Sequence, residues 1–261
     1  MTRYKLGEIC EIVSGSTPKT GIEEYWDGDA KWITPAEIDD DSYIITDSVR
    51  KITELGVKKT GLSPLPEGTV ILSSRAPIGK VAIAGCEMYC NQGFKNLICS
   101  DIINNRYLYW FLKGNTAYLN SLGRGATFKE ISKQIVSAIE VNVPTLAEQK
   151  AAVSQLEKMN DIIRMRRQQL QKLDELVKAR FIELFGEETE FDKWHCCTIG
   201  DVADVCVGVV IKPTQYYTDK GIPAFRSLNI GEMRVKDADW VYFTEEGHHK
   251  NQKSVIRKND V

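Results

Sequence analysis

The sequence has no long run of apolar residues, although 43% of its 261 residues are hydrophobic. A membrane-spanning helix needs about 18 consecutive apolar residues, and a secretory signal peptide needs an apolar core behind its first basic residues. Neither pattern is present, and the chain begins with Met-Thr-Arg-Tyr-Lys. We therefore expect a cytoplasmic protein that does not associate with a membrane.

Patterns for metal binding and for disulfides are also missing. The seven cysteines are an odd number without a Cys-x-x-Cys pair, which is typical of reduced thiols in a protein core. They are Cys10, Cys86, Cys90, Cys99, Cys196, Cys197 and Cys206. The run His195-Cys196-Cys197 has no second ligand pair at the spacing of a zinc site. We predict no metal site.

The sequence lacks the common catalytic motifs. There is no Gly-x-Gly-x-x-Gly or Gly-x-x-x-x-Gly-Lys-Ser/Thr loop, and no Asn/Asp-Pro-Pro-Tyr segment of the kind found in adenine methyltransferases. The three histidines do not accompany a candidate nucleophile. Glu148-Gln149-Lys150 resembles the Glu-x-Lys of nucleases, but no partner carboxylate is evident. We expect no catalytic residues and no enzyme.

Basic residues are not in excess, because 34 Lys and Arg face 36 Asp and Glu, for a formal net charge of −2. A nucleic-acid-binding protein is expected to show a basic face. Net charge averages over all faces, so this balance weakens a DNA-binding interpretation without excluding it.

What the sequence does contain is one long amphipathic segment, from Thr145 to Gly186. Thr145 and Glu148 form a capping-box pattern, and Gly186 is a typical helix stop. Apolar residues recur between them at a mean step of about 3.5, which predicts a helix of roughly 60 Å that pairs with another helix. The predicted pairing residues are Val153, Leu156, Ile163, Leu170, Leu173, Val177, Phe181 and Leu184, with Met159 in the same stripe.

The sequence before this helix predicts mixed α and β structure. Apolar or alternating runs predict strands at 5–13, 31–33, 69–74, 81–84 and 138–143, and helices at 105–113, 116–122 and around 129–136. The strands at 69–74 and 81–84 predict a hairpin with Arg75 and Lys80 at its tip. The aromatic residues at 107, 109, 110 and 111 fit a buried helix, with base stacking as the alternative.

The sequence after the helix repeats the beginning of the chain. Leu6 to Gly15 aligns with Ile199 to Gly208, Ile33 to Ile38 with Phe225 to Ile230, and Pro66 to Val70 with Arg257 to Val261. The second copy ends before the predicted hairpin, so it should expose an edge or an apolar face. We predict an α+β fold with a mixed-sheet domain at 1–143, the helix at 144–186 and an incomplete domain of the same type at 187–261.

Several motifs resemble those of one protein family. They are Lys5-Leu6-Gly7-Glu8-Ile9 followed by Gly15-Ser16-Thr17-Pro18, the run from Ile71 to Lys80, Asn91-Gln92-Gly93-Phe94-Lys95, and Gly125-Ala126-Thr127 leading to the run from Ile139 to Gln149. On these residues the chain resembles the specificity subunit of a type I restriction-modification enzyme. It departs from the family at its end, where the rest of the second target-recognition domain and a closing helix are absent, which implies a truncated version.

The resemblance implies an adaptor without catalytic residues. Each target-recognition domain of such a subunit reads one half of a split DNA sequence, and the helices between the domains set the spacing. The implied partners are double-stranded DNA, methyltransferase subunits and a restriction subunit. S-adenosylmethionine, ATP and Mg are expected on those partner subunits, and no cofactor on this chain. A homodimer paired through the long helix would supply a second recognition domain.

Candidate DNA contacts are loop residues with hydroxyl, amide or cationic side chains, because such groups bind base edges and phosphates. The candidates are Ser16, Thr17, Lys19, Arg75, Lys80, Asn91, Gln92, Lys95, Arg124, Thr127 and Lys129. The alternative for each is an ordinary solvated turn. A second function also stays open, in which the chain binds methyltransferase subunits and interferes with the intact enzyme without reading DNA. A self-contained enzyme has no motif in its favour.

Overall fold

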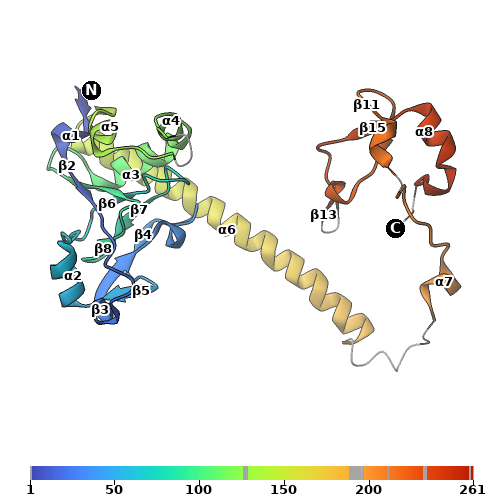
Figure 1. Cartoon of the computed structure of the whole chain (residues 1–261), viewed down its shortest axis with the longest axis horizontal. Helices are drawn as coiled ribbons and strands as arrows, with labels where there is room; N and C mark the ends of the chain where they lie inside the picture. Colours follow the sequence, from blue (N-terminus) through green and yellow to red (C-terminus); the bar gives the residue numbers. More distant parts are fainter. Residues whose placement is uncertain are drawn as a thin grey trace. The chain divides into compact units, whose positions relative to one another are not determined.

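The computed structural model describes residues 2–125, 129–187, 195, 197–210, 212–231, 234–258 and 260. The chain divides into two units, Met1–Asp174 and Glu175–Val261, and each has sheets of its own (Figure 1). The predicted α+β fold with mixed sheets and one long helix is confirmed. The predicted domain boundaries at 143 and 186 stay predictions. Among the described residues, no helix is both long and apolar enough to span a membrane.

Unit 1 contains most of the regular structure. Its strands are β1 (Thr2–Lys5), β2 (Cys10–Ser14), β3 (Trp26–Ile33), β4 (Ile44–Ile45), β5 (Arg50–Ile52), β6 (Val70–Leu72), β7 (Val81–Ala84), β8 (Tyr89–Cys90), β9 (Lys95–Cys99) and β10 (Glu140–Val143). Its helices are α1 (Leu6–Ile9), α2 (Glu54–Thr60), α3 (Asn105–Gly114), α4 (Thr116–Ser121), α5 (Lys133–Ser137) and the start of α6 (Leu146–Phe185), with 3-10 turns η1 (Glu23–Tyr25) and η2 (Pro35–Glu37).

The main sheet of unit 1 has five strands in the order β2-β9-β6-β7-β4. The first four alternate in direction, and the short β4 runs parallel to β7. The hairpin formed by β6 and β7 is confirmed, with Leu72 opposite Val81. Every residue of β6 and β7 is buried, as expected for central strands covered on both faces.

The two faces of this sheet are packed by different parts of the chain. Val70, Leu72, Val81 and Ile83 join one apolar core, which α1, α3, α4 and α5 cover. The alternate residues of the same strands join a second core with residues of β3, β8 and the loops near them. A smaller sheet, β5-β3-β8, lies at the side of the unit together with α2 (Figure 1). The helix predicted from the aromatic residues is confirmed as a core helix, because Tyr109 is buried in the first core.

Two predicted elements differ in the structure. The strand expected at 5–13 is interrupted by α1, because Leu6 and Ile9 both enter the core and Glu8 accepts a hydrogen bond from the Lys5 N–H. The helix expected around 129–136 begins only at Lys133. Ser132 is its N-cap, and the two residues before that cap are paired with the β6–β7 hairpin. Both differences come from contacts that a local pattern does not contain.

The prediction of a common buried position for the cysteines is partly wrong. Cys10 and Cys90 are buried, whereas Cys197 and Cys206 are exposed. These two lie in the repeat of unit 2, where less apolar surface is covered. Cys196 is outside the described residues.

The long helix α6 is confirmed, with 40 residues between the predicted caps. Glu148 accepts from the N–H and the hydroxyl of Thr145, and Gly186 has the left-handed φ of +85° that favours glycine. The prediction that Val153 pairs with another helix is wrong. Its side chain is only 5% exposed, so it packs within its own chain. The other predicted pairing residues and Met159 are 39% to 63% exposed, so their apolar stripe is open along the helix.

The first turns of α6 are fastened to unit 1 by Gln149, whose side chain is fully buried. Its amide accepts from the Asn104 N–H at 2.8 Å and donates to the carbonyls of Ile102 and Pro144 at 3.1 and 2.9 Å. Farther along, Glu157 accepts from Tyr43 and Arg106. The helix therefore leaves unit 1 in a direction that buried hydrogen bonds determine.

We expect Gln149→Leu to destabilise unit 1 by about 1–3 kcal/mol, because it leaves a buried N–H and two carbonyls without partners. The free energy of unfolding of unit 1 is measured by urea unfolding, with hydrogen exchange of unit 1 peptides as the signal. Gln168→Leu, on the exposed part of the same helix, is the control and should stay within about 0.5 kcal/mol. Equal effects of the two substitutions would contradict the anchoring role of Gln149.

Apart from the end of α6, the described residues of unit 2 form short elements. They are α7 (Ile199–Val202), η4 (Pro213–Tyr216), β11 (Tyr217–Thr218), β12 (Ile222–Ala224), η5 (Ser227–Asn229), β13 (Ile230–Gly231), β14 (Arg234–Val235), β15 (Val241–Phe243), α8 (Glu245–Lys250) and η6 (Gln252–Ser254). Three of its strands form a sheet in the order β11-β15-β12.

These elements repeat the side of unit 1 built from β3, β5 and α2. The Tyr25 carbonyl accepts from the Thr53 N–H at 3.0 Å, and the Tyr216 carbonyl accepts from the Thr244 N–H at 2.9 Å. Thr53 and Thr244 are the N-caps of α2 and α8, and each accepts from the glycine three residues on at 3.1 Å. The two units thus form the same hydrogen bonds at corresponding positions, which agrees with the repeat predicted from the sequence.

The repeated apolar residues differ in burial between the two units. Leu6, Ile9 and Ile12 of unit 1 are at most 4% exposed. Their counterparts Ile199, Val202 and Val205 are 72% or 73% exposed. In unit 1 these side chains pack on residues between 70 and 143, which have no counterpart among the described residues of unit 2. These three positions of the repeat are therefore buried in unit 1 and exposed in unit 2, while the incomplete second domain stays a prediction.

Candidate DNA interface

Four loops that carry the candidate residues meet at one end of the main sheet. At this end β2 and β6 finish, whereas β9 and β7 begin, because the neighbouring strands run in opposite directions. We call the segments 14–19, 73–80 and 91–95 and the described residues of 124–131, which are 124, 125 and 129–131, together the loop cluster. The sequence predicted these segments separately, and the sheet brings them together.

Backbone hydrogen bonds join the four segments. The Ser16 N–H donates to the Cys90 carbonyl at 3.0 Å, the Ser74 N–H to Gly93 at 2.7 Å, and the Ile131 N–H to Ser74 at 2.9 Å. Thr17 also donates from its hydroxyl to Gln92. The segments 14–19 and 91–95 approach so closely that a Cβ at Gly15 would lie 2.1 Å from the Asn91 carbonyl oxygen. Only glycine fits at that position.

Two tryptophans hold the segment 14–19 against the smaller sheet. The Trp32 indole N–H donates to the Ser16 carbonyl at 3.0 Å, and the Trp26 indole N–H to the Lys19 carbonyl at 3.3 Å. The Arg50 guanidinium lies 3.6 Å from the centre of the Trp26 ring, within cation–π range. The backbone of this loop is fixed, while the Lys19 side chain remains exposed.

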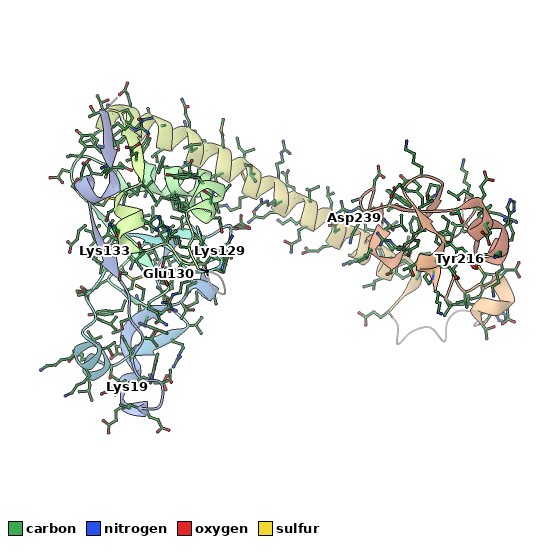
Figure 2. The ribbon with its side chains drawn as sticks, turned by 45° about the horizontal axis from the view of Figure 1, so that its top comes forward. Lys19, Lys129, Glu130, Lys133, Tyr216 and Asp239 are labelled. Carbon is green, nitrogen blue, oxygen red and sulfur yellow. The ribbon has the colours of Figure 1, made fainter. Side chains whose placement is uncertain are left out.

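The cations of the cluster divide into free and engaged ones. Lys19, Arg124 and Lys129 are exposed, and none of the hydrogen bonds among described residues uses their side-chain nitrogens. Figure 2 shows Lys129 beside Glu130 and Lys133, with Lys19 farther along the unit. Lys80 is partly buried and donates to the Pro35 carbonyl at 3.1 Å. Thr127 lies outside the described residues.

The prediction that Lys95 contacts DNA is wrong, because its side chain is buried. It is 7% exposed, and its ammonium donates to the Ser74 hydroxyl at 3.3 Å and to Glu130 at 3.2 Å. A direct contact with DNA would require this buried group to leave both partners. Lys95 therefore acts inside the domain, although the sequence placed it on a surface loop.

Glu130 links two of the candidate residues, although it was not itself predicted as part of the interface. One carboxylate oxygen accepts from Lys95 and the other from Arg75 Nε at 2.9 Å. Burial alone would raise the pKa of this carboxyl, but the hydrogen bonds and charges of Arg75 and Lys95 outweigh it and lower the pKa below the ordinary 4.5. The sequence signal was a lysine close to the apolar residues Phe94, Leu97 and Ile98, because a lysine that is buried requires a partner.

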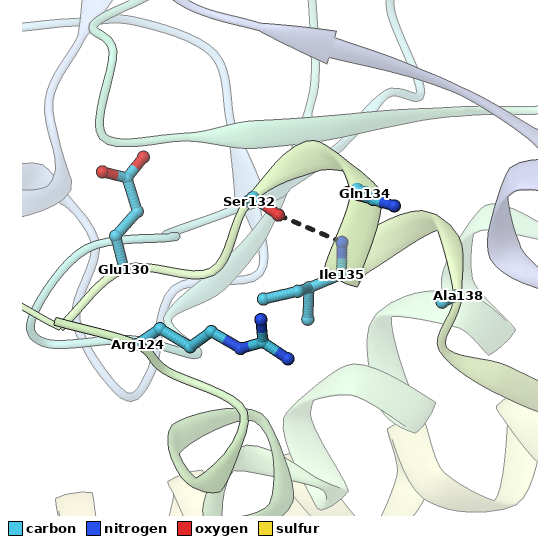
Figure 3. A pocket seen from close by; sticks show the side chains of 6 residues that line it. All are labelled: Arg124, Glu130, Ser132, Gln134, Ile135 and Ala138. Atoms are coloured by element: carbon cyan, nitrogen blue, oxygen red, sulfur yellow. Dashed lines mark hydrogen bonds between the residues drawn. The ribbon is translucent and has the colours of Figure 1, made fainter.

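A shallow depression of about 460 Å³ adjoins the cluster. Its lining residues are Arg124, Glu130, Ser132, Gln134, Ile135 and Ala138. Figure 3 shows the Arg124 guanidinium reaching towards Ile135, while the Glu130 carboxylate points away from it. The lining combines the exposed Arg124 cation with the polar side chains of Ser132 and Gln134 and with the apolar groups of Ile135 and Ala138. Among the described residues, no group of His, Cys, Asp or Glu is arranged to hold a metal ion.

The comparisons with known proteins agree with this architecture of a mixed-sheet recognition domain followed by a long helix. Residues 1–175 match the family described as "Type I restriction modification DNA specificity domain". Because this match covers more than half of the chain, the protein belongs to that family.

Relatives in the family support the assignment over nearly the whole chain. The type I restriction enzyme MjaIX specificity subunit of Methanocaldococcus jannaschii is 34% identical over 284 residues, covering 97% of this chain and 64% of the relative. The MjaVIII specificity subunit of the same organism is 22% identical over 272 residues, covering 98% of this chain and 61% of the relative. The chain thus spans less than two thirds of the length of these relatives.

Solved structures show the same fold at lower identity. A chain from a study of complex assembly and conformational transition of the type I R-M system aligns with a TM-score of 0.55 at 22% identity, covering 68% of this chain and 43% of that one. The HsdS subunit from Thermoanaerobacter tengcongensis aligns with a TM-score of 0.52 at 20% identity, covering 72% and 45%.

We expect the contribution of Glu130 to stability to depend on pH. A carboxyl whose pKa is lowered by folding stabilises the fold above its ordinary value of 4.5, and this contribution is lost as the pH falls through the lower, folded value. Glu130→Gln should therefore lower the melting temperature at pH 7, and the difference from the unmodified chain should shrink below about pH 4.5. Thermal melts between pH 3 and 7 measure this. Glu11→Gln, on the exposed side of β2, should show no such convergence.

Proposed function

We propose that this chain is the DNA-recognition adaptor of a type I restriction-modification system. In this role it directs methyltransferase and restriction subunits to a split DNA target and carries no catalytic residues itself. The observation that carries the proposal is the loop cluster, in which exposed cations and polar side chains from four segments share one end of a rigid sheet. S-adenosylmethionine, ATP and Mg would then be bound by the partner subunits in the cytoplasm.

We propose further that two copies pair through the open stripe of α6. Leu156, Ile163, Leu170, Val177 and Leu184 recur every seventh residue and are all exposed, as in the seam of a coiled coil. An antiparallel pair centred on Leu170 would place Leu156 against Leu184 and Ile163 against Val177. Apolar side chains would then meet along the whole seam.

Charge does not select this register. With Leu170 at the centre, Arg166 of one copy lies opposite Asp174 of the other, whereas Glu157 lies opposite Glu183, so the apolar seam is what supports the pairing. A helix of 40 residues is roughly 60 Å long. Half-sites one turn of B-DNA apart are separated by roughly 34 Å, so the pair is long enough to hold two copies of unit 1 on one DNA duplex.

The open apolar face of unit 2 favours a second candidate function. The described residues of unit 2 do not cover the counterparts of Leu6, Ile9 and Ile12. If unit 1 does not read DNA in this chain, the protein would still dock its partner subunits and would interfere with an intact enzyme.

We expect Leu170→Asp to convert a dimer into a monomer at about 20 μM, because it would bury two unpaired carboxylates at the centre of the seam. Light scattering of the full chain measures the mass. Gln168→Asp is the control, since it makes the same new side chain on the opposite side of the same helix. A monomeric unmodified chain would contradict the pairing.

The test of function is a map of N6-methyladenine in cells that contain this chain and a methyltransferase subunit of its system. We expect a palindromic split motif, because a dimer presents two identical recognition domains. Cells with the methyltransferase subunit alone are the control, and Leu170→Asp should abolish the motif. Co-purification of both proteins without new methylation would contradict DNA reading and support the interfering function.

A further inference from the structure

Lys95 is a buried charge in the main sheet of unit 1. It begins β9 and lies between the buried residues Phe94 and Asn96. Removing an ammonium from water is unfavourable, and replacing a buried ion pair with apolar side chains of similar size is often neutral or stabilising. Stability alone therefore does not account for Lys95. Its effect must lie in what it holds.

Lys95 holds Glu130, and Glu130 holds Arg75. The Lys95 ammonium and the Arg75 Nε occupy the two different oxygens of the carboxylate, at 3.2 and 2.9 Å. The backbones of Arg75 and Glu130 also form an isolated β-bridge. Arg75 is consequently fixed both at its main chain and at Nε, although its side chain is half exposed.

The terminal nitrogens of Arg75 are left for a ligand. None of the hydrogen bonds among the described residues uses its Nη atoms. A fixed guanidinium whose two Nη groups are free matches the O6 and N7 acceptors of guanine, which arginine binds with two hydrogen bonds in the major groove. A phosphate contact needs no such fixed direction, and Lys19, Arg124 and Lys129 are exposed cations suited to that role.

We propose that Arg75 reads a guanine in each half-site, and that Lys95 and Glu130 are positioning residues that keep its guanidinium in the reading orientation. This inference rests on the proposed function, because it assigns a base contact within the proposed DNA interface. It separates one specificity-determining residue from the cations that bind the backbone.

The test is a selection of binding sites from a random double-stranded DNA library, with the full chain and its variants. In Arg75→Lys the preference for guanine over the other bases at one position of each half-site should fall by roughly 10- to 100-fold. Lys95→Met and Glu130→Gln should weaken the preference at the same position and leave the salt dependence of binding unchanged, because neither residue contacts a phosphate. Lys129→Met is the control, and it should weaken binding to all sequences alike with a smaller salt dependence.

A readout without DNA keeps the positioning role testable. The Nε–H signal of Arg75 in ¹⁵N NMR spectra should lose its protection from exchange in Lys95→Met and in Glu130→Gln. An unchanged signal in both variants would overturn the positioning role. If the unmodified chain selects a motif and Arg75→Lys selects the same motif, the guanine contact is wrong while the proposed function stands. If the unmodified chain selects no motif, the proposed function itself fails.

Discussion

The antiparallel pairing of β2, β9, β6 and β7 is the constraint on which the candidate interface depends. Because each strand runs opposite to its neighbour, the loops after β2 and β6 and the loops before β9 and β7 share one end of the sheet. The register matters as much as the direction. A slip of β9 by one residue would turn Lys95 to the opposite face, and the contact with Glu130 would be lost.

The same arrangement explains why the overall charge is uninformative. Exposed cations gather at the loop cluster, whereas an acidic turn on the same unit is engaged elsewhere. Within that turn Asp41 pairs with Arg167 of α6 at 2.6 Å, and the Asp40 carbonyl accepts from Lys113. The Asp41–Arg167 pair therefore compensates one acidic side chain of this turn, while Lys19, Arg124 and Lys129 stay exposed in the loop cluster. A formal charge of −2 is compatible with a locally basic surface.

The elements that the sequence predicted well are those encoded by local contacts. The caps of α6 and the hairpin with Arg75 and Lys80 depend on residues close in sequence, and the repeat is a direct comparison of letters. The helical turn at Leu6–Ile9, the burial of Lys95 and the role of Glu130 depend on partners far along the chain. The same residue types occur in an exposed loop and at a buried strand end, so the sequence identified Arg75 and Lys95 as separate candidates without the Glu130 carboxylate that links these two residues.

Unit 2 shows the effect of local contacts without the burial that distant residues provide in unit 1. Thr198 and Asp201 cap α7 much as Lys5 and Glu8 cap α1, so the local turn forms in both units. The apolar residues of α7 are nevertheless exposed, because burial requires the strands and helices that follow residue 70 in unit 1. The open seam of α6 presents the same physical situation. Both surfaces consist of apolar side chains that the described residues leave exposed, and in the proposed dimer a second copy of α6 would cover the stripe.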